Sequence, residues 1–112
     1  MKVALVSPDL LIASRIASLI EQAGAELRRV EDPGEIANPA DMDLVLVDWA
    51  YREPAWSDIF DSWRSGHGPR GPRIVVFGPH ADLTAHAAAR KAGVGPMWAR
   101  SRLLSGLADL LR

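Results

Sequence analysis

A short apolar run that ends in a carboxylate constrains this chain most. Residues 43–49 read Asp-Leu-Val-Leu-Val-Asp-Trp, so four aliphatic side chains follow one another without a polar residue between them. A run this short, bounded by polar residues, is typical of a strand covered on both faces, as in parallel sheets. In open sheets of that kind, functional residues lie beyond the carboxyl ends of the strands. Asp48, which ends the run, is therefore the first candidate for a functional residue.

The composition indicates one globular domain spanning residues 1–112. Thirteen basic and fourteen acidic residues leave a net charge of −1, which gives no reason to expect binding to nucleic acid or to an acidic membrane surface. The chain has no cysteine, so disulfides and thiol chemistry are excluded. No apolar run approaches the roughly 20 residues of a membrane span, and no signal peptide precedes the first apolar run, so we expect a cytoplasmic domain.

A second apolar run, Lys2 to Val6, is followed by the clearest helix of the sequence. Ser7 is predicted to cap this helix, Pro8 to occupy its first position, and Asp9 to be favoured there by the helix dipole. Apolar residues recur at helical spacing up to Gly24, where a helix is expected to stop. These residues form one strand–helix unit.

The rest of the chain repeats this alternation. In order, we expect a polar edge strand at 26–30, barely one helical turn at 35–38, a helix capped by Ser57, a mobile loop at 65–72, a strand at 74–77, a helix capped by Asp82, a short strand at Met97–Trp98 and a helix capped by Ser101. Five β-α units predict an α/β domain, with a parallel sheet and helices on both faces.

The chain resembles the receiver domain of two-component response regulators over essentially its full length. The motifs are DLVLVD, KVALVSPDLLIASRIASLIEQAG, and RIVVFG followed by a helix that closes on Lys91-Ala92-Gly93. The resemblance implies a flavodoxin-like sheet of strand order 2-1-3-4-5, with the first and fifth helices on one face and the other three on the opposite face. It also places Asp48 at the phosphoacceptor position.

The acidic pair that holds magnesium in receivers is replaced by non-acidic residues here. Ser7 and Pro8 stand at those positions, and neither supplies the carboxylate that a hard cation needs. Asp9 follows one residue late and is explained as a helix-start residue. We therefore expect no metal and no cofactor.

Other receiver positions also differ. Gly78 replaces the Thr or Ser that bonds the phosphoryl group, and Arg100 replaces the Lys. The switch aromatic falls on Met97, with Trp98 beside it. Arg100 is expected to pair with Asp48 through a bidentate contact instead.

Three functions remain open. The favoured one is a degenerate receiver, or pseudo-receiver, that is not an enzyme and acts in signal transduction as a phosphorylation-independent protein-interaction module. The second is a working phosphoacceptor that uses Asp48 in a phosphorelay. The third is a small-ligand binder, because Trp49 and Tyr51 follow the central strand on an exit loop where burial is difficult, whereas Trp56 and Trp63 are expected in the core.

The partner surface is implied by the resemblance. Receivers use the face of the fourth helix, fifth strand and fifth helix, and here the fourth helix is rich in alanine. The apolar stripe of the last helix is expected to leave Leu104 or Leu110 partly exposed. We expect a protein partner or a homodimer at this face. His67, His80 and His86 are expected to be surface residues and not metal ligands.

Overall fold

Five parallel strands form a single sheet at the centre of the protein. The computed structural model describes residues 1–112, except for the side chain of Pro69. The strands are β1 (Lys2–Val6), β2 (Glu26–Val30), β3 (Leu44–Asp48), β4 (Arg73–Gly78) and β5 (Trp98–Ala99). Their order is 2-1-3-4-5, and each neighbouring pair is parallel. The predicted fold class and strand order are confirmed.

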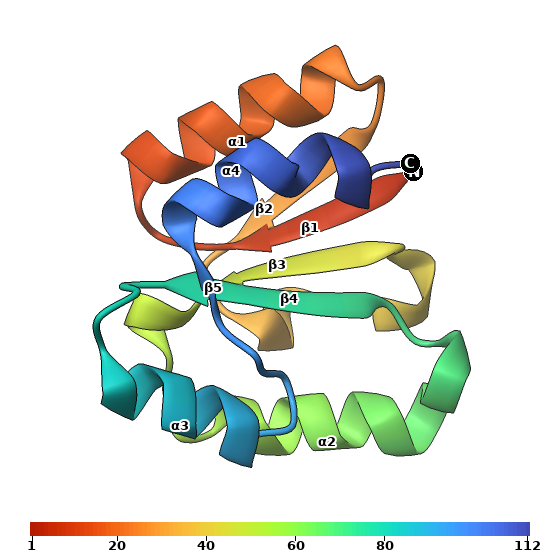
Figure 1. The fold of residues 1–112 in the computed structure, drawn as a ribbon. Coiled ribbons are helices and arrows are strands. Elements are labelled where there is room, and N and C mark those ends of the chain that lie inside the picture. The colour runs from red at the N-terminus through yellow and green to blue at the C-terminus, as the bar shows by residue number, and fades with distance from the viewer.

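Four α-helices cover the sheet, two on each face (Figure 1). Helices α1 (Leu10–Gln22) and α4 (Arg100–Leu110) pack on one face, and α2 (Trp56–His67) and α3 (Leu83–Lys91) pack on the other. Among the described residues, no helix has both the length and the apolar character needed to cross a membrane.

The helix expected between β2 and β3 does not form, so the prediction of five helices is wrong. Two short 3-10 turns, η1 (Pro33–Glu35) and η2 (Pro39–Asp41), occupy this segment. Each turn begins with a proline, which has no backbone N–H to donate. Asp32 and Asn38 accept hydrogen bonds from the Gly34 and Ala40 amides, so each turn is capped locally. Two prolines six residues apart leave no room for a longer helix.

Three of the predicted helix caps are also wrong. Asp9, not Ser7, caps α1: its Oδ1 accepts hydrogen bonds from the Leu11 and Ile12 amides, at 3.0 and 3.4 Å. Helix α2 begins at Trp56, so Ser57 already lies within the first turn. Helix α4 begins at Arg100, directly after the two-residue strand β5, and Ser101 likewise lies inside the helix. Asp82 caps α3 as predicted.

The segment 65–72, expected to be a loop, is largely helical. Helix α2 continues to His67, and a 3-10 turn, η4 (Gly68–Arg70), follows it. The buried Trp63 anchors this part of the helix against the core, and a glycine inside a helix costs only about 1 kcal/mol relative to alanine. The helix ends where Gly68 adopts a positive φ of 54°.

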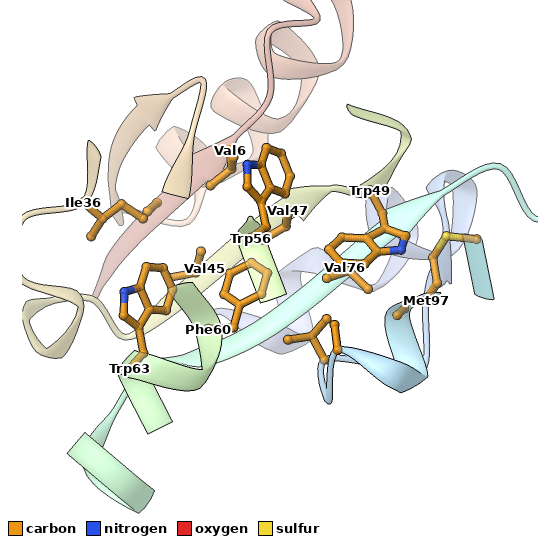
Figure 2. Close-up of a cluster of buried hydrophobic side chains, with 14 of the residues drawn as sticks. Val6, Ile36, Val45, Val47, Trp49, Trp56, Phe60, Trp63, Val76 and Met97 are labelled. Carbon is orange, nitrogen blue, oxygen red and sulfur yellow. The ribbon is translucent and has the colours of Figure 1, made fainter. Parts of the chain in front are cut away.

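Strand β3 alternates between leucine and valine, and the two faces of the sheet differ accordingly. Leu44 and Leu46 pack against α1 and α4, whereas Val45 and Val47 face α2 and α3. The smaller valines leave space for large aromatic rings, and Figure 2 shows these rings packed together on the valine side. They belong to Trp49, Trp56, Phe60 and Trp63, all of which are buried.

Removal of a helix cap should destabilise the protein only where the cap forms a hydrogen bond. Because Asp82 Oδ1 accepts a hydrogen bond from the Ala85 amide at 3.0 Å, Asp82→Ala should lower the free energy of unfolding by about 1 kcal/mol. Ser101→Ala should leave it within about 0.5 kcal/mol of the wild type, because Ser101 is exposed and caps nothing. Urea unfolding of both variants measures the difference. Equal losses would contradict the helix boundary at Arg100.

Candidate functional site at the carboxyl edge of β3

Asp48 and Ser7 meet beneath α1 and α4. Successive side chains of a strand point to opposite faces, so the alternation that sends Leu44 and Leu46 toward α1 and α4 sends Asp48 there as well. Ser7, directly after β1, lies on the same face. Both side chains are 0 % exposed, and Ser7 Oγ donates a hydrogen bond to Asp48 Oδ2 at 2.9 Å.

Two further contacts fix Ser7 in place. Its Oγ accepts a hydrogen bond from the Asp9 amide at 3.1 Å, so the hydroxyl both donates and accepts. Its carbonyl oxygen accepts from Nε and Nη2 of Arg29, each at 3.4 Å. Ser7 thus joins β1, β2 and β3 at the carboxyl edge, a role that the prediction of a helix cap did not include.

Arg100 faces the second oxygen of Asp48. Its Nη2 lies 3.9 Å from Asp48 Oδ1, which is an ion pair but too long for a hydrogen bond. Within the described structure, Asp48 Oδ1 and the buried Arg100 Nε have no hydrogen-bond partner. The expected pairing is present, but the bidentate geometry is wrong, because Ser7 already occupies one carboxylate oxygen.

Burial raises the pKa of Asp48 above the ordinary carboxyl value of 3.8. Removal of the charged form from water is the largest effect, and the nearby charge of Asp9 adds to it. The Ser7 hydrogen bond, the Arg100 charge and the Ala50 backbone oppose the increase in pKa without cancelling it.

Solved structures share this arrangement of strands and helices. No family model and no curated protein matches the sequence. A response-regulator receiver domain from Bermanella marisrubri superposes with a TM-score of 0.72 at 15 % identity, covering 99 % of this chain and 98 % of its own. The receiver domain of a histidine kinase from Clostridium thermocellum gives a TM-score of 0.70 at 15 % identity, with 99 % and 97 % covered. A CheY-like receiver from Methanospirillum hungatei gives 0.70 at 17 %, with 98 % and 92 % covered.

The protein has the fold of a response-regulator receiver domain. Asp48 ends β3 of this fold, where the sequence resemblance places the phosphoacceptor, and that assignment stays a prediction.

The residues around Asp48 do not fit the magnesium ion that receivers use. Asp9 Oδ1 accepts two backbone amides as the cap of α1, Pro8 has no donor oxygen in its side chain, and Ser7 Oγ is committed to Asp48. Among the described residues, no three His, Cys, Asp or Glu side chains cluster as metal ligands. Near α3, His86 Nε2 is instead 2.8 Å from the His80 carbonyl oxygen.

The Met97 side chain crowds Gly78, where the resemblance places the receiver Thr or Ser. A Cβ built on Gly78 would lie 2.9 Å from Met97 Sδ, closer than two such atoms pack. Met97 is buried at 5 % exposure, so it fills the space that a hydroxyl side chain would need. Its neighbour Trp98 is half-buried, with the Arg102 guanidinium stacked 4.3 Å from its ring centre. No pattern in the sequence indicates either contact.

Trp49 and Tyr51 differ in burial, and of the two only Trp49 lines the cleft at this edge. Trp49 is buried at 3 % exposure and its Nε1–H donates to the Ala85 carbonyl oxygen at 3.0 Å. It lies on the α2/α3 face, so the sheet separates it from the Asp48 carboxylate. Tyr51 is 44 % exposed. A cleft of about 560 Å³ does adjoin Trp49, between the η3 turn (Trp49–Tyr51), the start of α2 and the end of α3; its lining is Trp49, Ala50, Arg52, Glu53, Pro54, Ser57, Ala88, Lys91 and Ala92.

The raised pKa of Asp48 predicts a stabilising substitution. The folded state binds this proton more tightly than the unfolded state does, so stability from this group is lost as pH rises from the ordinary carboxyl pKa through the folded pKa. At neutral pH the buried charge therefore costs stability. Asp48→Asn should unfold at a higher urea concentration than the wild type at pH 7.

The advantage of Asp48→Asn should shrink as pH falls from the raised folded pKa toward 3.8, the ordinary carboxyl pKa, and should be lost below 3.8, where the aspartate is neutral in both states. The other carboxylates titrate in both proteins and cancel in the difference. An asparagine variant that is less stable at pH 7 would show that Ser7 and Arg100 outweigh the cost of burial.

Proposed function

We propose that this protein is a pseudo-receiver in signal transduction, which binds a protein partner without being phosphorylated and is not an enzyme. The observation that carries this proposal is the environment of Asp48. The carboxylate is fully buried, Ser7 bonds one oxygen, and Arg100 faces the other.

Phosphoryl transfer to Asp48 is disfavoured by the same contacts. The reaction needs an approach in line with the attacking oxygen, and metal and cationic groups that neutralise the transferred charge. Asp48 has no exposed surface, and Ser7 is a hydroxyl where a receiver has a metal-binding carboxylate. Arg100 brings one positive charge to the carboxylate, and no cluster of metal ligands accompanies it among the described residues.

The contacts of Asp48 also hold together the strand ends and the start of α4, whose arrangement phosphorylation would otherwise change. Ser7 joins β1 to β3, and Arg100 brings the start of α4 to the same carboxylate. The carboxyl edge of the sheet is therefore held in one arrangement. A domain built this way presents a constant surface to its partner.

The partner surface that we propose is formed by α3, β5 and α4, as in the expectation from the resemblance. Ala87 is exposed and Ala88 half-buried on α3, which lets a partner backbone approach closely. Beside β5, Trp98, Arg102 and Leu110 line a shallow depression. A stacked Trp–Arg pair offers both apolar area and positive charge, as protein interfaces favour.

Treatment with acetyl phosphate and magnesium tests this function. We expect no added mass on the wild-type protein by intact-mass spectrometry, because the nucleophile is buried and the metal ligands are missing. An ordinary receiver in the same reaction should gain one phosphoryl group, which serves as the positive control.

A single acid-labile phosphoryl adduct on the wild type, absent from Asp48→Asn, would instead establish a working phosphoacceptor. Substitution of Gly78 by threonine alone should not create one, because the new side chain has to displace Met97.

The cleft beside Trp49 supports a second function, the binding of a small ligand. Arg52 and Lys91 outnumber Glu53 at its rim, and Trp49, Pro54 and Ala88 give it an apolar lining. The Arg52 side chain is held in place, since Nη1 donates to the Trp49 carbonyl oxygen at 3.1 Å. This combination favours a flat molecule with a carboxylate.

Salicylate is a suitable probe for this cleft. Under the second function, it should raise the melting temperature of the wild type in a thermal-shift assay, and Arg52→Gln should abolish the increase. Arg28→Gln, which removes a positive charge from the exposed edge strand β2, is the control and should respond as the wild type does. Equal responses in all three proteins, or none in any, would contradict a carboxylate site in the cleft.

A further inference from the structure

A groove between α1 and α4 lies on the face of the sheet opposite the cleft beside Trp49. Its volume is about 720 Å³, and its lining is Asp9, Leu11, Ile12, Arg15, Leu19, Arg100, Ser101, Leu104 and Ser105. The floor is apolar, formed by side chains that also pack on the core, such as Ile12 and Leu104. The groove uses the side of α4 that faces α1, whereas the depression in the proposed partner surface lies on the side of α4 toward Trp98.

Leu11 stands at the rim of the groove almost fully in solvent. Its exposure is 82 %, and that of the adjacent Leu10 is 70 %. The first turn of a helix favours acidic side chains, because its backbone N–H groups carry partial positive charge. The two exposed leucines in this turn neither interact favourably with the helix dipole nor pack in the core. Their exposure indicates an apolar contact with another molecule.

Charges of both signs flank the groove. Asp9 lies at the start of α1, Arg15 lies six residues further along the same helix, and Arg100 begins α4. One face therefore carries a projecting apolar side chain, an apolar hollow, a carboxylate and guanidinium groups. In a twofold dimer the same patch must complement itself, and a patch with both charge signs and with both a projection and a hollow can do so.

We propose that two copies of this chain associate through the α1–α4 face, with their α1 helices antiparallel. A twofold axis close to Ile12 brings Asp9 of each copy beside Arg15 of the other. The same axis directs Leu11 of each copy toward the groove of the other. Opposite charges then meet at both ends of the contact, and the exposed leucines are buried between them.

The face is large enough for such a dimer. Helix α1 has 13 residues and α4 has 11, so the two helices span roughly 20 and 16 Å. A standard interface covers about 800 Å² on each partner, which is a small share of the 6304 Å² surface of this chain.

The two leucines first expected on one surface belong to different surfaces. Leu104 lines the groove with α1, whereas Leu110 lines the depression beside β5 and Trp98. Self-association by the α1–α4 face therefore leaves the α3–β5–α4 face open to a different protein.

Sedimentation of the full chain from micromolar to millimolar concentration tests the proposal. The weight-average mass should rise toward twice the 12.2 kDa of one chain. Leu11→Glu should raise the dimer dissociation constant by about 30-fold or more, since the change acts twice in a twofold dimer and introduces charge at the contact. Arg15→Glu, which sets two carboxylates opposite each other, should weaken the dimer as well.

Leu83→Glu is the matched control. Leu83 is 79 % exposed and lies in the first turn of α3, also behind an aspartate cap, but on the other face of the sheet. It should dimerise as the wild type does. Circular dichroism verifies that each variant is folded; if Leu11→Glu is not, Arg15→Glu decides.

A wild type that remains at 12.2 kDa at millimolar concentration would overturn the proposal. So would a dimer that Leu11→Glu and Arg15→Glu leave intact, or one that Leu83→Glu weakens equally.

Discussion

The burial of β3 on both faces is the constraint on which the rest of this structure depends. Its four aliphatic side chains are at most 2 % exposed, and such burial contributes about 6–12 kcal/mol in total. A strand buried in this way needs a neighbouring strand on each side and helices above and below. The parallel sheet and its two helical layers follow from this need.

The stability gained from burying β3 also offsets the cost of burying the Asp48 carboxylate. Asp48 continues the same strand into the interior, where a carboxylate loses its hydration. Ser7 and Arg100 compensate only in part, because the pKa of Asp48 remains raised. The fold tolerates this cost because the aliphatic residues before Asp48 fix its position in the sheet. A buried charge that opposes stability is characteristic of a functional site.

The two faces of the sheet have become specialised for different contacts. The leucine side carries α1, α4 and the Asp48 site, and the groove that we propose for self-association lies outside it. The valine side carries the tryptophans, the cleft beside Trp49 and helix α3 (Figure 2). Asp48 ends the strand on the leucine side, and the η3 turn that begins at Trp49 places the next side chain on the valine side. The three surfaces can therefore be tested with separate substitutions.

The sequence by itself determined the strands, their α/β alternation and the position of Asp48 at the end of β3, because these depend on local hydrophobic periodicity. Strand periodicity could also have placed Ser7 and Asp48 on one face. Only the tertiary structure decided that Ser7 bonds Asp48, that Met97 fills the space beside Gly78, and that Trp49 is buried. These contacts join residues about 20 to 40 positions apart, and their distances depend on how the helices pack, which no local pattern records.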